Sequence, residues 1–97
     1  MNLTPASIVV VSPDQMASEI AGETVILGLS AGRYYGLDAV GARVWQLIQS
    51  PIAVSDVGRT IVGEYDVAPE RCEADVLALL QKMVDAGLVE VRRADAP

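Results

Sequence analysis

The chain has 97 residues, enough for one small domain, and 52% of them are hydrophobic, so a modest core can form without metals or disulfides. A single cysteine and the lack of histidine exclude an internal disulfide and a structural zinc site, and we expect no cofactor. The net charge of −6 disfavours a nucleic-acid partner, whose phosphates require a basic face. A basic or neutral peptide suits this charge better.

The two ends of the chain carry few signals. The apolar run from Ile8 to Val11 is short, has no basic segment before it and is followed by Pro13, which matches neither a signal peptide nor a membrane span. We therefore expect a cytoplasmic protein with a reduced thiol at Cys72. Residues 1–97 are predicted to form a single domain, with 93–97 as a frayed tail.

Residues 8–37 are predicted to form short strands, because β-branched or alternating segments are separated by turn residues. The strand segments are "SIVVVS", "MASEIAG", "ETVILGL" and "RYYGL". "SAG", at 30–32, supplies a hairpin turn in which Gly32 can adopt a positive φ. Since side chains alternate along a strand, Tyr34 and Tyr35 must lie on opposite faces of the sheet. The pattern does not say which of them is buried.

From Asp38 onward the hydrophobic period becomes helical. Asp38 is the predicted N-cap of a first helix that ends before Pro51. The expected inward positions of this helix are Val40, Val44, Trp45, Leu47 and Ile48.

Two more helices follow. A second, weak helix over 54–67 is predicted to be capped by Ser55, with Val57, Ile61 and Val62 inward. A third starts at Pro69, reaches Ala86 and ends at Gly87. The closing "LVEVRR" is expected to be extended.

The predicted third helix has an unusually wide apolar arc. The arc centres on Cys72, Val76, Leu79, Leu80 and Met83, with Leu77 and Val84 on one side. A surface helix of a small domain normally needs a narrower stripe. Either the helix is central and covered on two sides, or part of the arc lines a groove for a partner, with Asp75 and Lys82 as a polar rim. The two interpretations are compatible.

Catalytic patterns are sparse. Without histidine there is no conventional nucleophile–histidine pair, and the acidic residues lack a recognisable paired spacing. Cys72 lies on the apolar arc, where a thiol usually behaves as a small hydrophobe. "GLSAG" and "GRYYG" lack the spacing of phosphate-binding loops. These features favour a binding protein over an enzyme.

Several motifs in one order resemble the PqqD-like family of peptide chaperones, also called RiPP recognition elements. The family pattern combines a "tGryy-Ln" strand, a "Ga-iW-li" helix, an "eydv" helix end and a terminal "aD-l-fL--L---GLv" helix. This chain has "GRYYGLD" at 32–38, "GARVW" at 41–45, "EYDV" at 64–67, and "DVL" at 75–77 leading to "GLV" at 87–89. The resemblance covers roughly residues 16 to 92.

The resemblance implies an α+β fold similar to winged-helix domains, with an N-terminal three-stranded antiparallel sheet followed by three α-helices. Members are not enzymes: they bind the leader segment of a ribosomally made precursor peptide as an added strand and present it to a modifying enzyme or leader peptidase. The implied site lies between the third strand of that sheet, which is the segment "RYYGL" at 33–37, and the third helix. Its candidate residues here are Arg33, Tyr34, Tyr35, Gly36, Leu37, Asp75, Val76, Leu79, Lys82 and Met83. Asp75 could pair with a leader lysine or could serve only as an early-turn helix acid.

The pathway is less defined than the family. A short acidic domain suits the lysine-bearing leaders usual in lasso-peptide biosynthesis, which we favour, whereas a PqqD-type chaperone for a radical enzyme of PQQ or another pathway is the alternative. A small regulatory or scaffolding subunit that binds a protein through the same edge stays open. A DNA-binding role conflicts with the charge. Exposed strand edges permit a monomer or a strand-exchanged dimer.

Overall fold

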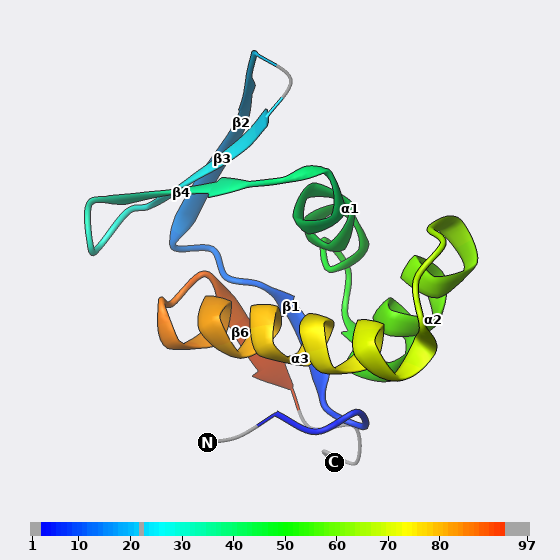
Figure 1. The fold of residues 1–97 in the computed structure, drawn as a ribbon. Helices are drawn as coiled ribbons and strands as arrows, with labels where there is room; N and C mark the ends of the chain where they lie inside the picture. The colour runs from blue at the N-terminus through cyan, green and yellow to red at the C-terminus, as the bar shows by residue number, and fades with distance from the viewer. Residues whose placement is uncertain (1–2, 22, 93–97) are drawn as a thin grey trace.

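The computed structural model describes residues 3–21 and 23–92, so the tail predicted at 93–97 lies outside the described residues (Figure 1). It confirms the α+β class. In chain order the elements are β1 (Ile8–Val11), β2 (Gln15–Ile20), β3 (Glu23–Gly28), β4 (Arg33–Leu37), α1 (Ala39–Leu47), β5 (Ile52–Ala53), α2 (Val54–Glu64), α3 (Pro69–Asp85) and β6 (Val89–Arg92). No helix within the described ranges is both long and apolar enough to cross a membrane.

The expected three-stranded antiparallel sheet is the meander β2-β3-β4. In Figure 1 β2 and β3 extend away from the three helices. The first predicted strand segment does not join this sheet. Instead, β1 is the central strand of a second antiparallel sheet, between β5 and β6. Val9 pairs with Val91 there, which connects the two ends of the described chain.

Local signals place most of the turns and helix ends. Gly32 has φ +65° in the β3–β4 turn, as predicted, and its N–H donates to the Gly28 carbonyl at 2.8 Å. The Asp38 carboxylate accepts from the N–H of Gly41 at 2.8 Å, which confirms the N-cap of α1. Gly87, at φ +78°, follows the end of α3, and the N–H of Leu88 reaches back to the Met83 carbonyl at 2.9 Å.

The predicted cap of the second helix is wrong. Helix α2 begins after Ala53, which makes no side-chain cap bond, and Ser55 lies inside its first turn. The N–H groups of Val54 and Ser55 instead donate to the carbonyls of Ser7 and Pro5, each at 2.9 Å. Backbone from the N-terminal segment therefore satisfies donors that a capping side chain usually satisfies.

Helix α3 packs against α2 and β6 and supplies much of the core. Four side chains of its apolar arc are buried, namely Cys72, Val76, Leu80 and Met83, whereas Leu79, Leu77 and Val84 are partly buried against them. Trp45, which the helical pattern placed inward, is 5% exposed and belongs to the same core. Most of the central residues of the arc are therefore covered by the rest of the fold, whereas Leu79, which was also predicted at its centre, is only partly covered.

Candidate functional site

Strand β4 forms one edge of the meander and pairs only with β3 among the described strands. In an antiparallel pair, alternate backbone N–H and C=O groups point away from the partner strand, so this edge offers donors and acceptors to a further strand. The register also assigns its two tyrosines. Tyr35 lies opposite Ile26, which is fully buried, and packs against the core, whereas Tyr34 lies opposite Leu27 on the outer face and is 72% exposed.

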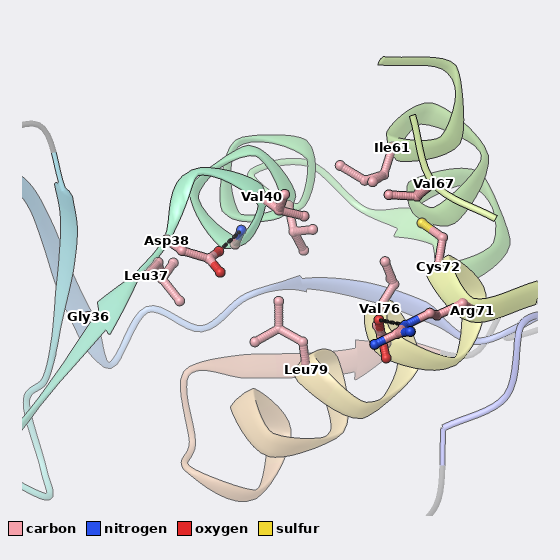
Figure 2. A pocket seen from close by; sticks show the side chains of 13 residues that line it. Gly36, Leu37, Asp38, Val40, Ile61, Val67, Arg71, Cys72, Val76 and Leu79 are labelled. Carbon is pink, nitrogen blue, oxygen red and sulfur yellow. Dashed lines mark hydrogen bonds and ion pairs between the residues drawn. The ribbon is translucent and has the colours of Figure 1, made fainter. Parts of the chain in front are cut away.

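A pocket of about 460 Å³ lies where the end of β4 meets α1 and α3 (Figure 2). Its residues come from four parts of the chain: Gly36, Leu37, Asp38, Val40, Gly41, Val44, Ile61, Val67, Arg71, Cys72, Asp75, Val76 and Leu79. Val44, Ile61, Cys72 and Val76 are buried and give it an apolar interior. We refer to it as the first pocket.

Residue 41, in the first turn of α1 beside the first pocket, is a glycine with little space for a side chain. A Cβ built on Gly41 would lie 3.2 Å from the Asp38 carboxylate and 3.3 Å from the Leu37 side chain. Those contacts are tighter than most real Cβ contacts, so a larger residue would require the Asp38 and Leu37 side chains to shift by a few tenths of an ångström.

A second pocket, also about 460 Å³, continues along β4 toward its N-terminal end. Its lining residues are Ile26, Tyr34, Tyr35, Gly36, Leu37, Leu79, Lys82, Met83, Ala86 and Leu88. Gly36, Leu37 and Leu79 line both pockets. The two pockets together, which we call the β4–α3 groove, lie beside β4 from Tyr34 to Leu37.

Nine of the ten candidate site residues line this groove. They are Tyr34, Tyr35, Gly36, Leu37, Asp75, Val76, Leu79, Lys82 and Met83, whereas Arg33 lines neither pocket. Val76 and Met83 are buried and form the floor, whereas Asp75 and Lys82 are exposed at the rim. The structure thus brings the predicted strand and helix residues together, and their role in binding stays a prediction.

The sequence reading missed the residues that α1, α2 and the loop before α3 contribute, among them Val40, Val44, Ile61 and Val67. The helical pattern marked the first three as inward, but periodicity cannot separate a core position from one that lines a pocket. Val67 is 42% exposed and lies just before α3. Its position beside the pocket depends on how α2 and α3 pack together.

The Cys72 thiol is enclosed at the base of the first pocket. Its Sγ donates to the Gly58 carbonyl at 3.8 Å, and desolvation by burial, with a smaller contribution from the charge of Asp75, raises the thiol pKa. A raised pKa keeps sulfur in its protonated, poorly nucleophilic form. The geometry agrees with the prediction of an inert side chain.

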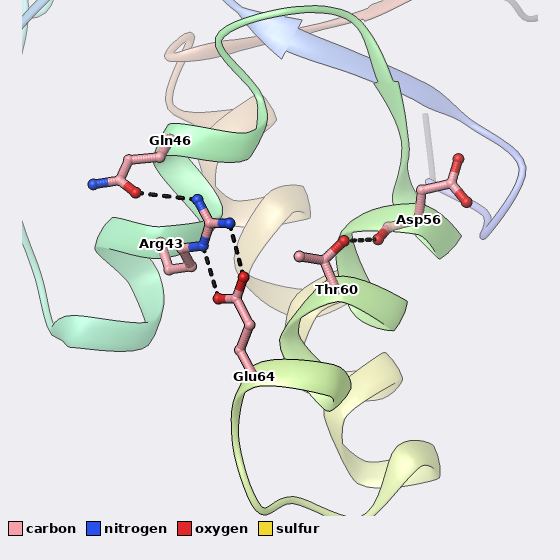
Figure 3. A network of polar contacts seen from close by, with 5 residues as sticks. All are labelled: Arg43, Gln46, Asp56, Thr60 and Glu64. Atoms are coloured by element: carbon pink, nitrogen blue, oxygen red, sulfur yellow. Dashed lines mark hydrogen bonds and ion pairs between the residues drawn. The ribbon is translucent and has the colours of Figure 1, made fainter.

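An ion pair connects α1 to the end of α2 (Figure 3). Arg43 donates from Nε and Nη2 to the two carboxylate oxygens of Glu64, each at 2.8 Å, and from Nη1 to Gln46 at 3.2 Å. The bidentate contact lowers the pKa of Glu64 and raises that of Arg43. Because α1 and α2 both contribute walls of the first pocket, this pair helps to maintain their relative position.

A small α+β domain with a free strand edge beside an apolar groove is suited to binding an extended peptide by strand addition. Residues 23–89 match the family model described as "Coenzyme PQQ synthesis protein D (PqqD)", which spans more than half of the chain. The chain belongs to the PqqD family. A comparison with curated proteins gives no match.

Three solved structures share the fold. The structure titled "TbiB1 in Complex with the TbiA(beta) Leader Peptide" is 31% identical, with a TM-score of 0.76, and the alignment covers 91% of this chain and 99% of that one. A lasso peptide synthetase B1 complexed with the leader peptide is 22% identical, with a TM-score of 0.75 and coverages of 84% and 96%. The PqqD truncation of Methylobacterium extorquens PqqCD, described as a stand-alone RiPP recognition element, is 20% identical, with a TM-score of 0.75 and coverages of 91% and 94%.

Proposed function

We propose that this protein binds the leader segment of a ribosomally made precursor peptide in the β4–α3 groove and presents it to a modifying enzyme or leader peptidase of lasso-peptide biosynthesis. The observation that carries the proposal is the free edge of β4 beside two apolar pockets. Support comes from family membership and from the 31% identity to TbiB1, whose structure is a complex with a leader peptide.

The proposed binding mode is strand addition. A peptide that pairs with β4 forms backbone hydrogen bonds that tolerate many sequences, and its alternate side chains point toward the same face as Tyr35 and Leu37. Those side chains enter the groove, where Leu79 and Met83 provide apolar contacts. The remaining side chains lie on the outer face beside Tyr34. Backbone pairing therefore supplies affinity, and the groove supplies selectivity.

We propose a binding role without catalysis. The raised pKa of Cys72 argues against its use as a nucleophile, and it is the only thiol in the chain. Among the described residues there is no cluster of three or more potential metal-ligating side chains. The buried floor and the exposed strand edge fit capture and presentation of a peptide.

A second candidate is a PqqD-type chaperone for a radical enzyme of PQQ or another peptide pathway. It is favoured by the description of the family model and by the fold shared with the PqqD truncation. The lasso setting is favoured by the higher identity to TbiB1. Genes beside this one decide the matter, since a short precursor gene with a transglutaminase-like protease indicates the lasso setting.

The experiment is a titration of the protein with a fluorescent leader peptide made from the precursor gene beside its own. We expect saturable binding with a micromolar or lower Kd, about 8 kcal/mol. N-methylation of successive peptide amides should weaken binding at every second position, because only alternate amides face β4. A scrambled leader is the control. Absence of saturable binding overturns the proposal, and loss without a two-residue period overturns strand addition.

A further inference from the structure

The two ends of the β4–α3 groove carry opposite charges. The charged residues that line the first pocket are Asp38, Arg71 and Asp75, so acidic groups are in excess there. Lys82 is the single charged residue lining the second pocket. The groove is therefore acidic where β4 ends and basic where β4 begins.

The acidic end has one carboxylate that is held in place. Asp38 Oδ1 accepts from the Gly41 N–H at 2.8 Å, which directs the carboxylate to the start of α1 between Leu37 and the pocket (Figure 2). Asp75 makes only a long contact with Arg71, 3.8 Å between Oδ2 and Nε, and both side chains are more than 70% exposed. Such a pair is weak in water, so Asp75 can exchange its partner for a cation on a bound peptide at little cost.

The spacing of these charges defines a peptide pattern. Asp75 and Lys82 are seven positions apart on α3, about 10 Å along a helix that rises 1.5 Å per residue. An extended peptide advances about 3.3 Å per residue, and every second side chain faces the groove. Three consecutive groove-facing positions therefore span both ends, with the middle one above Leu79, which lines both pockets.

Resting on the proposed function, we propose that the groove selects leaders with a basic side chain at the Leu37 end, an apolar side chain over Leu79 and an acidic side chain at the Tyr34 end. The basic residue can lay its methylene stem over the apolar wall and place its charge in the first pocket, whose lining carries Asp38 and Asp75. Lys82 pairs with the acid. Because β4 runs from Tyr34 to Leu37, an antiparallel leader carries the basic residue before the acidic one, and a parallel leader carries the reverse.

The test uses a matched set of short peptides with alternating threonine and valine and a central leucine. They carry lysine, glutamine or glutamate two residues before and two residues after that leucine. Binding is measured by fluorescence polarisation at low and high salt, beside the protein's own leader. We expect one charge order to bind about tenfold more tightly than the reverse order at low salt, with the difference shrinking as salt is added.

Charge reversal in the protein assigns the effect to a residue. Lys82→Glu should move the preference at the acidic peptide position from glutamate to lysine and leave the basic position unchanged. Arg59→Glu is the matched control, because Arg59 is exposed on α2, lines neither pocket of the groove and undergoes the same charge change. It should leave the preference as it is in the unchanged protein.

The outcomes separate the two proposals. If the own leader binds and Lys82→Glu changes no preference, or if the own leader binds and no peptide of the set does, the charge-selection proposal is overturned while the proposed function stands. If neither the own leader nor any peptide binds, both are overturned. A preference that Lys82→Glu moves at one position and Arg59→Glu leaves intact establishes the selection.

Discussion

Leu79 and Leu80 are adjacent on α3 but have different surroundings, which makes them a sharp test of the groove. Leu79 is partly buried and lines both pockets, whereas Leu80 is fully buried in the core. We predict that Leu79→Asp weakens leader binding strongly and stability mildly. Leu80→Ala should weaken stability strongly and, in the fraction that stays folded, change leader affinity little.

The magnitude follows from burial. Complete burial of a leucine side chain contributes about 1.5–3 kcal/mol, and the smaller, exposed part of Leu79 is worth about 0.5–1 kcal/mol to a peptide that covers it. Covering a carboxylate instead adds a desolvation cost of about 1–3 kcal/mol. The sum of about 1.5–4 kcal/mol corresponds to a Kd roughly 10- to 1,000-fold higher. The folded state should lose the contribution of the larger, buried part of the side chain, about 1–2 kcal/mol or about 4–16 °C in Tm, against about 2–5 kcal/mol for Leu80→Ala.

The assay combines leader titration with thermal unfolding on the same preparations. Leu79→Ala is the second variant, since it removes the contact without adding a charge and should weaken binding by roughly tenfold or less. Wild-type affinity in a folded Leu79→Asp protein would refute the groove assignment. A loss of Tm as large as that of Leu80→Ala would show that Leu79 belongs to the core.

Two further predictions concern the tyrosines and the ion pair. Tyr35→Ala should lower the free energy of unfolding by about 1–3 kcal/mol, because Tyr35 packs on the core. Tyr34→Ala should change it by less than about 0.5 kcal/mol, because Tyr34 is exposed. Chemical denaturation measures both values, and equal effects would contradict the assigned faces. Because Arg43 lowers the pKa of Glu64 in the folded state, the pair stabilises the protein above the usual glutamate pKa, and this contribution is lost as pH falls through the lowered value. Arg43→Gln should therefore show a smaller drop in denaturation midpoint on acidification below about pH 4 than the wild type, and an unchanged drop would contradict the pairing.

The strand and helix of the candidate site were predictable because their signals are local. Alternation defines β4, Gly32 permits its turn, Asp38 caps the helix that follows, and Gly87 ends α3. Each depends on residues a few positions apart, so the sequence alone is informative. The motif resemblance then joined two segments about 40 positions apart along the chain, which periodicity could not do.

Other features depended on contacts between distant segments. The pairing of β1 with β6, which places Val11 opposite Val89, cannot be derived from either segment, because a β-branched pattern indicates a strand but not its partner. The missing cap at Ser55 has the same cause, since the N-terminal backbone satisfies the start of α2. A local rule fails where a distant segment satisfies the same hydrogen bonds.

The sequence by itself determined that the chain forms an acidic α+β binding domain with a strand of two oppositely facing tyrosines and a helix with an over-wide apolar arc. Only the tertiary structure decided that Tyr35 faces the core and Tyr34 faces outward, because this depends on the register of β4 against β3. It also decided where the groove lies and where its charges fall. The physical reason is that alternation and helical period define faces, whereas packing between elements defines which of those faces are covered.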